Sequence, residues 1–259
     1  MSADRVLLLR MKSVSKWCRR VLFVVLVLLG VAWLWSEANQ WLLRWRGERL
    51  LADIQSLEVG KSSWTDAEAL MKKRGLRHLG DSCTPEKCQY GIRMEHTLPR
   101  WFWGYPDYGV MNWMPRIADN VGLRISVISA VFTVEKGIVT SKSFWEMVRL
   151  PVRDWFLPGS GHMSELSVNS AEEADFSRYY LGFDYKLSRM HPHSAATADK
   201  RGLVVTYSPD EDISERAKLM DFRLDCITRF IPCKNEREIL PEGQVLLEEH
   251  RALLKAKGD

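Results

Sequence analysis

The sequence predicts an α+β protein with an N-terminal transmembrane helix, followed by an antiparallel sheet with flanking helices. Three observations indicate this class. A basic N-terminal stretch precedes an apolar run at residues 21–35. Two segments rich in β-branched and aromatic residues, 124–134 and 138–148, flank the sequence Glu-Lys-Gly, which is typical of a long hairpin. Segments 37–57 and 64–74 carry apolar residues three or four positions apart, the period of amphipathic helices.

The composition indicates a folded chain, and the distribution of charge argues against a nucleic-acid binder. The 259 residues are 46% hydrophobic and 27% charged, with a net charge of +4. Residues 1–20 hold six Lys and Arg and one Asp; removing them from the totals of 37 and 33 leaves 31 basic and 32 acidic residues. A nucleic-acid binder should keep its basic residues on the folded part. We therefore expect no nucleic-acid partner.

The apolar run predicts contact with a lipid bilayer through residues 21–36. Residues 21–35 cover roughly 22 Å as a helix, against a hydrocarbon core of ~30 Å, so flanking residues must supply the rest. We expect residues 1–20 to form a basic tail ahead of this anchor. Two alternatives stay open: a signal peptide cleaved after Ala38, and a buried helix of a soluble core.

The basic residues on the two flanks predict the orientation of the anchor. Six precede the run, and three follow it within fifteen residues, namely Arg44, Arg46 and Arg49. The flank richer in Lys and Arg remains in the cytoplasm. We therefore expect a single-pass protein of the cytoplasmic (inner) membrane, with a cytoplasmic N-terminus and a periplasmic C-terminal domain.

The remainder divides into three expected parts. Residues 37–58 form an amphipathic stalk helix, residues 59–254 a single α+β exported domain, and residues 255–259 a frayed tail. The stalk helix is expected to pack on the domain; lying on the membrane or pairing with a second copy are its alternatives.

Local signals place the elements of the exported domain. A helix over 64–74 is expected between Ser63 as N-cap and Gly75 as stop. In the hairpin, Gly137 should adopt a left-handed conformation. The remaining elements are expected at 88–95, 165–169, 185–190 and 203–207 as strands, and at 215–223, capped by Asp212 or Ser214, and 241–255 as helices.

Five cysteines divide into Cys18 at the membrane edge and two close pairs. In an exported domain such pairs are more often disulfides than metal ligands. Four cysteines allow three connectivities, and the turn-like sequence between Cys83 and Cys88 favours the local one, with Cys226 paired to Cys233. Zinc is the alternative for the first pair, but its spacing to nearby histidines matches no common finger pattern. We expect no metal ion.

The tested motifs predict no catalytic residue and no cofactor. Gly60-Lys61-Ser62 resembles the end of a phosphate-binding loop, but Gln55 stands where that loop needs Gly. Ser160 lies near His162, but between glycines in a loop-like stretch rather than in the Gly-x-Ser-x-Gly turn of hydrolases.

One aromatic segment is the candidate binding site. Proline and glycine interrupt it, so it cannot form one regular helix. Its rings either pack under the sheet or form an exposed platform for a peptide, a glycan or the bilayer surface. The candidate residues are Trp101, Trp103, Tyr105, Tyr108 and Trp113.

Several features together resemble one group of proteins. They are the anchor, the segment Leu-Glu-Val-Gly-Lys-Ser-Ser-Trp-Thr-Asp-Ala at 57–67, the Cys83/Cys88 hairpin, and Phe-Arg-Leu-Asp-Cys-Ile-Thr at 222–228 before Cys233. Over most of residues 50–245 the chain resembles uncharacterised single-pass, periplasm-facing envelope proteins of acidobacteria. That resemblance implies the location and the disulfides, and it supplies no activity. More distantly, the Gly-Lys-Ser turn, short helix and hairpin are similar to small periplasmic modules such as the lipoprotein subunit of the outer-membrane barrel-assembly machine, whose lipidated cysteine this chain lacks.

These observations favour a non-catalytic binding or scaffolding module on the outer face of the membrane, with an envelope protein or a glycan as possible partner. A periplasmic hydrolase is the alternative. Its site would not be readable from the sequence, and its residues, for example His162 with Ser160 or Glu165, would converge only in the folded chain.

Overall fold

A computed structural model confirms the α+β class. It describes residues 3–75, 77–78, 83–95, 126–150, 164–174, 180–182, 199–229, 231, 233–243 and 245. The chain forms two compact units, Met1–Asn39 and Gln40–Asp259.

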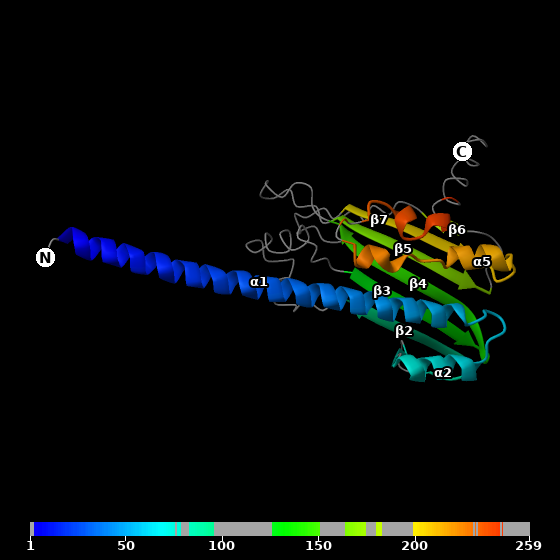
Figure 1. The fold of residues 1–259 in the computed structure, drawn as a ribbon. Coiled ribbons are helices and arrows are strands. Elements are labelled where there is room, and N and C mark those ends of the chain that lie inside the picture. Colours follow the sequence, from blue (N-terminus) through cyan, green and yellow to red (C-terminus); the bar gives the residue numbers. More distant parts are fainter. Residues whose placement is uncertain are drawn as a thin grey trace, which may run out of the picture. The chain divides into compact units, whose positions relative to one another are not determined.

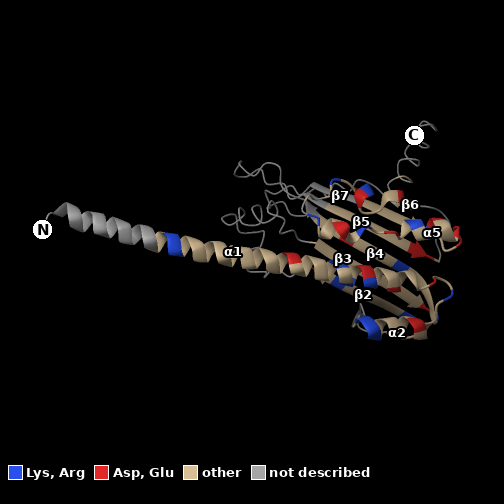
Figure 2. Ribbon diagram, in the orientation of Figure 1, with Lys and Arg blue, Asp and Glu red and all other residues tan. Residues whose placement is uncertain are grey.

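The first unit consists of the N-terminal part of α1 (Ala3–Gln55). Between Arg20 and Glu37 this helix carries no charged residue, and Figure 2 shows the stretch as one unbroken tan segment. Its large side chains are exposed, as in Leu22 (58%) and Leu28 (63%). Within the described residues, Trp17–Gln55 is the one helix that is long and apolar enough to cross a membrane.

The second unit contains one seven-stranded sheet in the order β1-β2-β3-β4-β5-β7-β6. Its strands are β1 (Arg77–His78), β2 (Lys87–Glu95), β3 (Ser126–Glu135), β4 (Ile138–Leu150), β5 (Ser164–Glu173), β6 (Tyr180–Gly182) and β7 (Asp199–Tyr207). The described part of this unit also contains α2 (Trp64–Arg74), α5 (Ile213–Leu219) and the 3-10 turns η1 (Leu224–Ile227) and η2 (Glu236–Glu238).

One strand pair departs from the predicted antiparallel arrangement, because β5 and β7 are parallel. After β5 the chain skips one position in the sheet, forms β6, and returns through β7 into the gap. Since β6 runs antiparallel to β7, the strand that fills the gap has the direction of β5. The remaining pairs are antiparallel, so the sheet is mixed.

The elements with strong local signals form as predicted. In α2, Ser63 and Asp66 make a reciprocal capping box, and Gly75 ends the helix with φ 62°. The hairpin of β3 and β4 turns at Lys136 (φ 52°) and Gly137 (φ 79°). Gly137 supplies the left-handed conformation at no steric cost, and Lys136 accepts it within the turn.

Three expected elements differ or lie outside the described part. The helix after β7 runs over Ile213–Leu219, shorter than the expected 215–223, and Asp212 caps it by accepting a hydrogen bond from Ser214 N at 2.7 Å. The expected strand at 185–190 lies outside the described residues. Of the expected C-terminal helix, residues 241–243 and 245 are helical and the rest lies outside the described residues.

Among the described residues, the helical elements that cross the sheet lie on one face of it. Residues 40–55 of α1, with α5 and η1, cross this face (Figure 1). Residues of α1 and of the sheet form one apolar core, which includes Leu50, Ile54, Ile128, Phe132 and Phe144, each at most 1% exposed. The residues that alternate with these on the strands, such as Ser129, Val131 and Trp145, are half-buried. The covered face is therefore the core face.

Candidate functional site

The sequence-predicted binding residues lie outside the described part of the chain. This applies to Trp101, Trp103, Tyr105, Tyr108 and Trp113, and also to Ser160 and His162 of the hydrolase alternative. Glu165 is the second residue of β5. For the segments that hold these candidates, the structure describes the strands before and after each one.

Two long connections start and finish at the same end of the sheet, and a third finishes there after starting at Gly182, which pairs with Val204 inside β7. Segment 96–125 joins β2 to β3, segment 151–163 joins β4 to β5, and segment 183–198 joins β6 to β7. The register aligns the strand ends involved: Glu95 pairs with Val127, Ser126 with Val148, Leu150 with Ser164, and Ser164 with Asp199. We call this the long-connection end of the sheet.

The opposite end, which we call the turn end, has short connections. It holds the two-residue turn between β3 and β4 and the Cys83/Cys88 hairpin, where Gly137 N donates to Pro85 O at 2.7 Å. The aromatic candidates, Ser160 and His162 therefore all belong to segments attached at the other end. A fixed scaffold with its long connections at one end is a common arrangement in binding proteins.

Helix α1 runs along the core face from the long-connection end to the turn end. Gly47 packs against Ile128, the third residue of β3. Leu57 O, just beyond the helix, accepts from Lys142 Nζ at 2.5 Å, and Gly60 N donates to Val139 O at 2.8 Å beside the hairpin turn. Gln40, where the second unit begins, therefore lies at the long-connection end.

A buried ion cluster occupies the core face near the turn end. Glu172 on β5 is 1% exposed and lies 3.2 Å from Lys142 Nζ on β4 and 2.6 Å from an Arg216 nitrogen on α5. Arg216 also donates to Pro209 O at 3.1 Å. With Leu57 O as the second acceptor for Lys142, the cluster joins the chain after α1, two strands and α5.

This cluster is buried away from solvent, and its charges join the elements around it. Burial lowers the pKa of Lys142, and the Glu172 carboxylate opposes that shift. Burial, followed by the negative charge of Glu172, raises the pKa of the neighbouring Tyr207. The side chains of Lys142 and Glu172 are 5% and 1% exposed, so no substrate can reach them without opening the core. A buried carboxylate with two cationic partners fixes the packing of the elements it joins.

A second acidic side chain, Glu146, is buried on the same face in surroundings that differ from those of Glu172. Glu146 on β4 is fully buried, and among the described residues neither of its carboxylate oxygens has a hydrogen-bond partner. Burial raises its pKa well above the usual range, the charge of Asp225 raises it further, and Arg44 opposes these effects. Burial between the sheet, α1 and η1 therefore favours the protonated form of Glu146.

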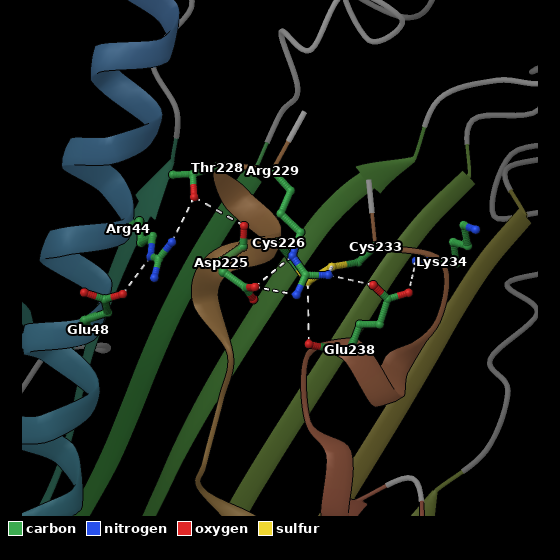
Figure 3. A network of polar contacts seen from close by, with 9 residues as sticks. All are labelled: Arg44, Glu48, Asp225, Cys226, Thr228, Arg229, Cys233, Lys234 and Glu238. Atoms are coloured by element: carbon green, nitrogen blue, oxygen red, sulfur yellow. Dashed lines mark hydrogen bonds and ion pairs between the residues drawn. A yellow bond between two sulfur atoms is a disulfide. The ribbon is translucent and has the colours of Figure 1, made fainter. Parts of the chain in front are cut away.

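The Cys226–Cys233 pair lies within a network of polar contacts (Figure 3). Both predicted pairs stand at disulfide distance, with Cα atoms 4.6 Å apart for Cys83–Cys88 and 5.5 Å apart for Cys226–Cys233, and Cys18 is free and exposed. Local pairing is therefore the connectivity that this fold accommodates.

Arg229 organises the segment closed by the second disulfide. It donates to Asp225 and to Glu238, each at 2.7 Å, and approaches the Cys233 sulfur at 3.7 Å. Glu238 in turn accepts from Lys234 N at 2.9 Å. On the other side Arg44 of α1 donates to Thr228 Oγ1 at 3.1 Å and pairs with Glu48 (Figure 3). The disulfide and these ion pairs together fix the segment against α1.

The sequence interpretation missed Lys142, Glu146 and Glu172. A signal for two of them exists in the strand at 138–148, where Lys142 and Glu146 share a period of two with Phe144 and Val148. Charged residues in phase with the apolar face of a strand indicate buried charges. The partner Arg216 has no such signal, because α5 reaches the cluster through the tertiary fold.

The described residues include no group of three His, Cys, Asp or Glu side chains that could hold a metal ion. Comparison with protein-family models, with curated proteins and with solved structures finds no match to this chain.

Proposed function

We propose that this protein is a membrane-anchored, non-catalytic binding or scaffolding module, with an envelope protein or a glycan as partner. The observation that carries the proposal is that segments 96–125 and 151–163 both start and finish at one end of the sheet, where segment 183–198 also finishes. The core face beneath is held by the ion cluster, by two disulfides and by the α1 packing. Such a scaffold suits the display of a recognition surface.

We also propose that residues 21–36 cross the cytoplasmic membrane once, with the N-terminus in the cytoplasm and the second unit in the periplasm. The exposed apolar face of α1 supports the membrane contact, since such a surface is unfavourable in water. The excess of basic residues before the run supports the orientation. The two cysteine pairs support an oxidising compartment.

The binding proposal is tested by replacing one ring of the aromatic segment. The change Trp103→Ala should abolish retention of a crosslinked partner in native envelopes and leave the melting temperature nearly unchanged, because an exposed ring contributes to binding and not to packing. Truncating a tryptophan at the centre of an interface typically costs 2 kcal/mol or more of binding energy, which is at least about 30-fold in affinity.

Trp64→Ala is the matched control. Trp64 packs against Tyr90 in the described core, with ring centroids 5.8 Å apart. This variant should lower the melting temperature by several degrees and keep the partner at temperatures where it remains folded. If Trp103→Ala instead costs about 3 to 5 kcal/mol of stability, the ring is a core residue and the aromatic segment is not the binding surface.

A further inference from the structure

The segment closed by the Cys226–Cys233 disulfide carries an exposed apolar residue and contacts α1 through Thr228, which accepts a hydrogen bond from Arg44. Ile231 is 68% exposed, and Phe230 and Pro232 are its neighbours in sequence. The bridge and the Arg229 ion pairs hold both ends of this short segment. A large apolar side chain on a braced segment bears a cost in water that contact with an apolar partner would remove.

Helix α1 adds exposed aromatic rings beside this segment. Trp41 and Trp45 are 57% and 48% exposed, one helical turn apart on the outer side of α1. Arg44 connects the two features, because its guanidinium lies 5.5 Å from the centre of the Trp41 ring and also donates to Thr228. Arg49 stacks on Trp45 at 3.7 Å. Tryptophan with arginine is the pairing found where proteins meet lipid headgroups.

The chain itself limits how far this surface can lie from a bilayer. Four residues, 36–39, separate the apolar run from Gln40, and even a fully extended chain covers at most about 18 Å between Trp35 and Gln40. Gln40 lies at the long-connection end, as argued above. If the run spans a membrane, that end of the sheet is kept at the membrane surface.

We propose that Trp41, Trp45 and Ile231 form a second membrane contact, in which the disulfide-closed segment inserts Ile231 into the lipid interface. The inference rests on the proposed anchor and goes beyond it, because it assigns the bilayer as the partner of residues in the second unit. It also gives the Cys226–Cys233 bridge a role in holding an inserted residue in place.

Photocrosslinking in the full-length protein tests this contact. The chain is reconstituted into vesicles of phosphatidylethanolamine and phosphatidylglycerol, and a diazirine-bearing amino acid replaces Ile231. Ile213 is the matched control, since it is an isoleucine that is 80% exposed and begins α5 after the turn end of β7. After irradiation, mass spectrometry should find phospholipid adducts at position 231 in several-fold excess over position 213.

The same label at position 28, within the apolar run, separates this inference from the proposed anchor. Lipid adducts at 28 with none in excess at 231 would overturn the second contact and keep the anchor. Absence of adducts at both positions would overturn both. A crosslink from 231 to another protein chain, including a second copy, would replace the bilayer by a protein partner and so contradict the inference.

Discussion

Glu172 and Glu146 are buried on the same face of the sheet, and they differ in whether a cationic side chain lies within hydrogen-bond distance. Glu172 has Lys142 and Arg216 within hydrogen-bond distance, so its carboxylate is compensated where it is buried. Glu146 has no such partner among the described residues, and its burial raises its pKa, which favours the protonated form. The first acid joins several elements, and the second makes the stability of the fold depend on pH.

Replacement of Glu146 by glutamine should change that pH dependence. Below the ordinary pKa of glutamate both folded and unfolded chains carry the proton. As pH rises above it, the unfolded chain ionises and the folded chain does not, so stability falls until the raised folded-state pKa is reached. Glu146→Gln removes this fall. Relative to the wild type, its free energy of unfolding should increase with pH above about 4.5, by at most about 1.4 kcal/mol per pH unit, and its melting temperature should rise accordingly.

Thermal melts of the detergent-solubilised chain between pH 5 and pH 8 measure this effect. Glu173→Gln is the control, because Glu173 ends the neighbouring strand β5 and is exposed. That variant should follow the wild type across the range. Parallel curves for Glu146→Gln and wild type would show that Glu146 is ionised in the folded protein.

At the scale of elements, prediction from the sequence succeeds where the determining signals are local. The Ser63 cap, the Gly75 stop and the Gly137 turn lie within a few residues of the elements they bound, and α2 and the β3–β4 hairpin form there. The parallel pairing of β5 with β7 depends on a skipped position in the sheet, which leaves no local trace. For the candidate site, the sequence identified the aromatic residues. The strand register was needed to show at which end of the sheet their segment is attached.

Gly47 shows how closely α1 packs on the sheet. A Cβ atom there would lie 2.3 Å from Ile128 Cδ1 and 3.0 Å from Leu224 Cδ1. Gly47→Ala gains about 1 kcal/mol of helix propensity but overpacks the core, which typically costs about 1–3 kcal/mol. We expect a net loss of stability, because Ile128 is fully buried and its methyl group has little space to move.

The second substitution Ile128→Val removes the methyl group that the new Cβ would meet. Alone it should cost about 0.5–1.5 kcal/mol. Combined with Gly47→Ala it should cost less than the sum of the two single changes, with a favourable coupling of about 0.5 kcal/mol or more in a double-mutant cycle of denaturant unfolding. Strict additivity would show that α1 shifts away from the sheet instead.

For the whole molecule, three features converge on one arrangement at a membrane. The apolar part of α1 ends four residues before the second unit, the long connections leave the sheet at the end where α1 enters it, and the disulfide-closed segment lies at that same end. The turn end instead carries the compact hairpin and the ion cluster. If the apolar run spans a membrane, the four residues that follow it limit how far the long-connection end of the sheet can lie from the bilayer.

The arrangement requires that the second unit lie outside the cytoplasm and that the anchor stay attached. A reporter enzyme that is active only in an oxidising compartment should therefore be active when fused after Asp259, because the more basic flank of the apolar run stays in the cytoplasm. Carbonate-washed membranes should retain the full-length chain, and non-reducing peptide mapping should join Cys83 to Cys88 and Cys226 to Cys233. Activity of a cytoplasm-specific reporter at the same position would reverse the orientation. Release of a chain that begins at Asn39 would identify the N-terminal segment as a cleaved signal, and the surface around Trp41 and Ile231 would then have no tether to hold it at the membrane.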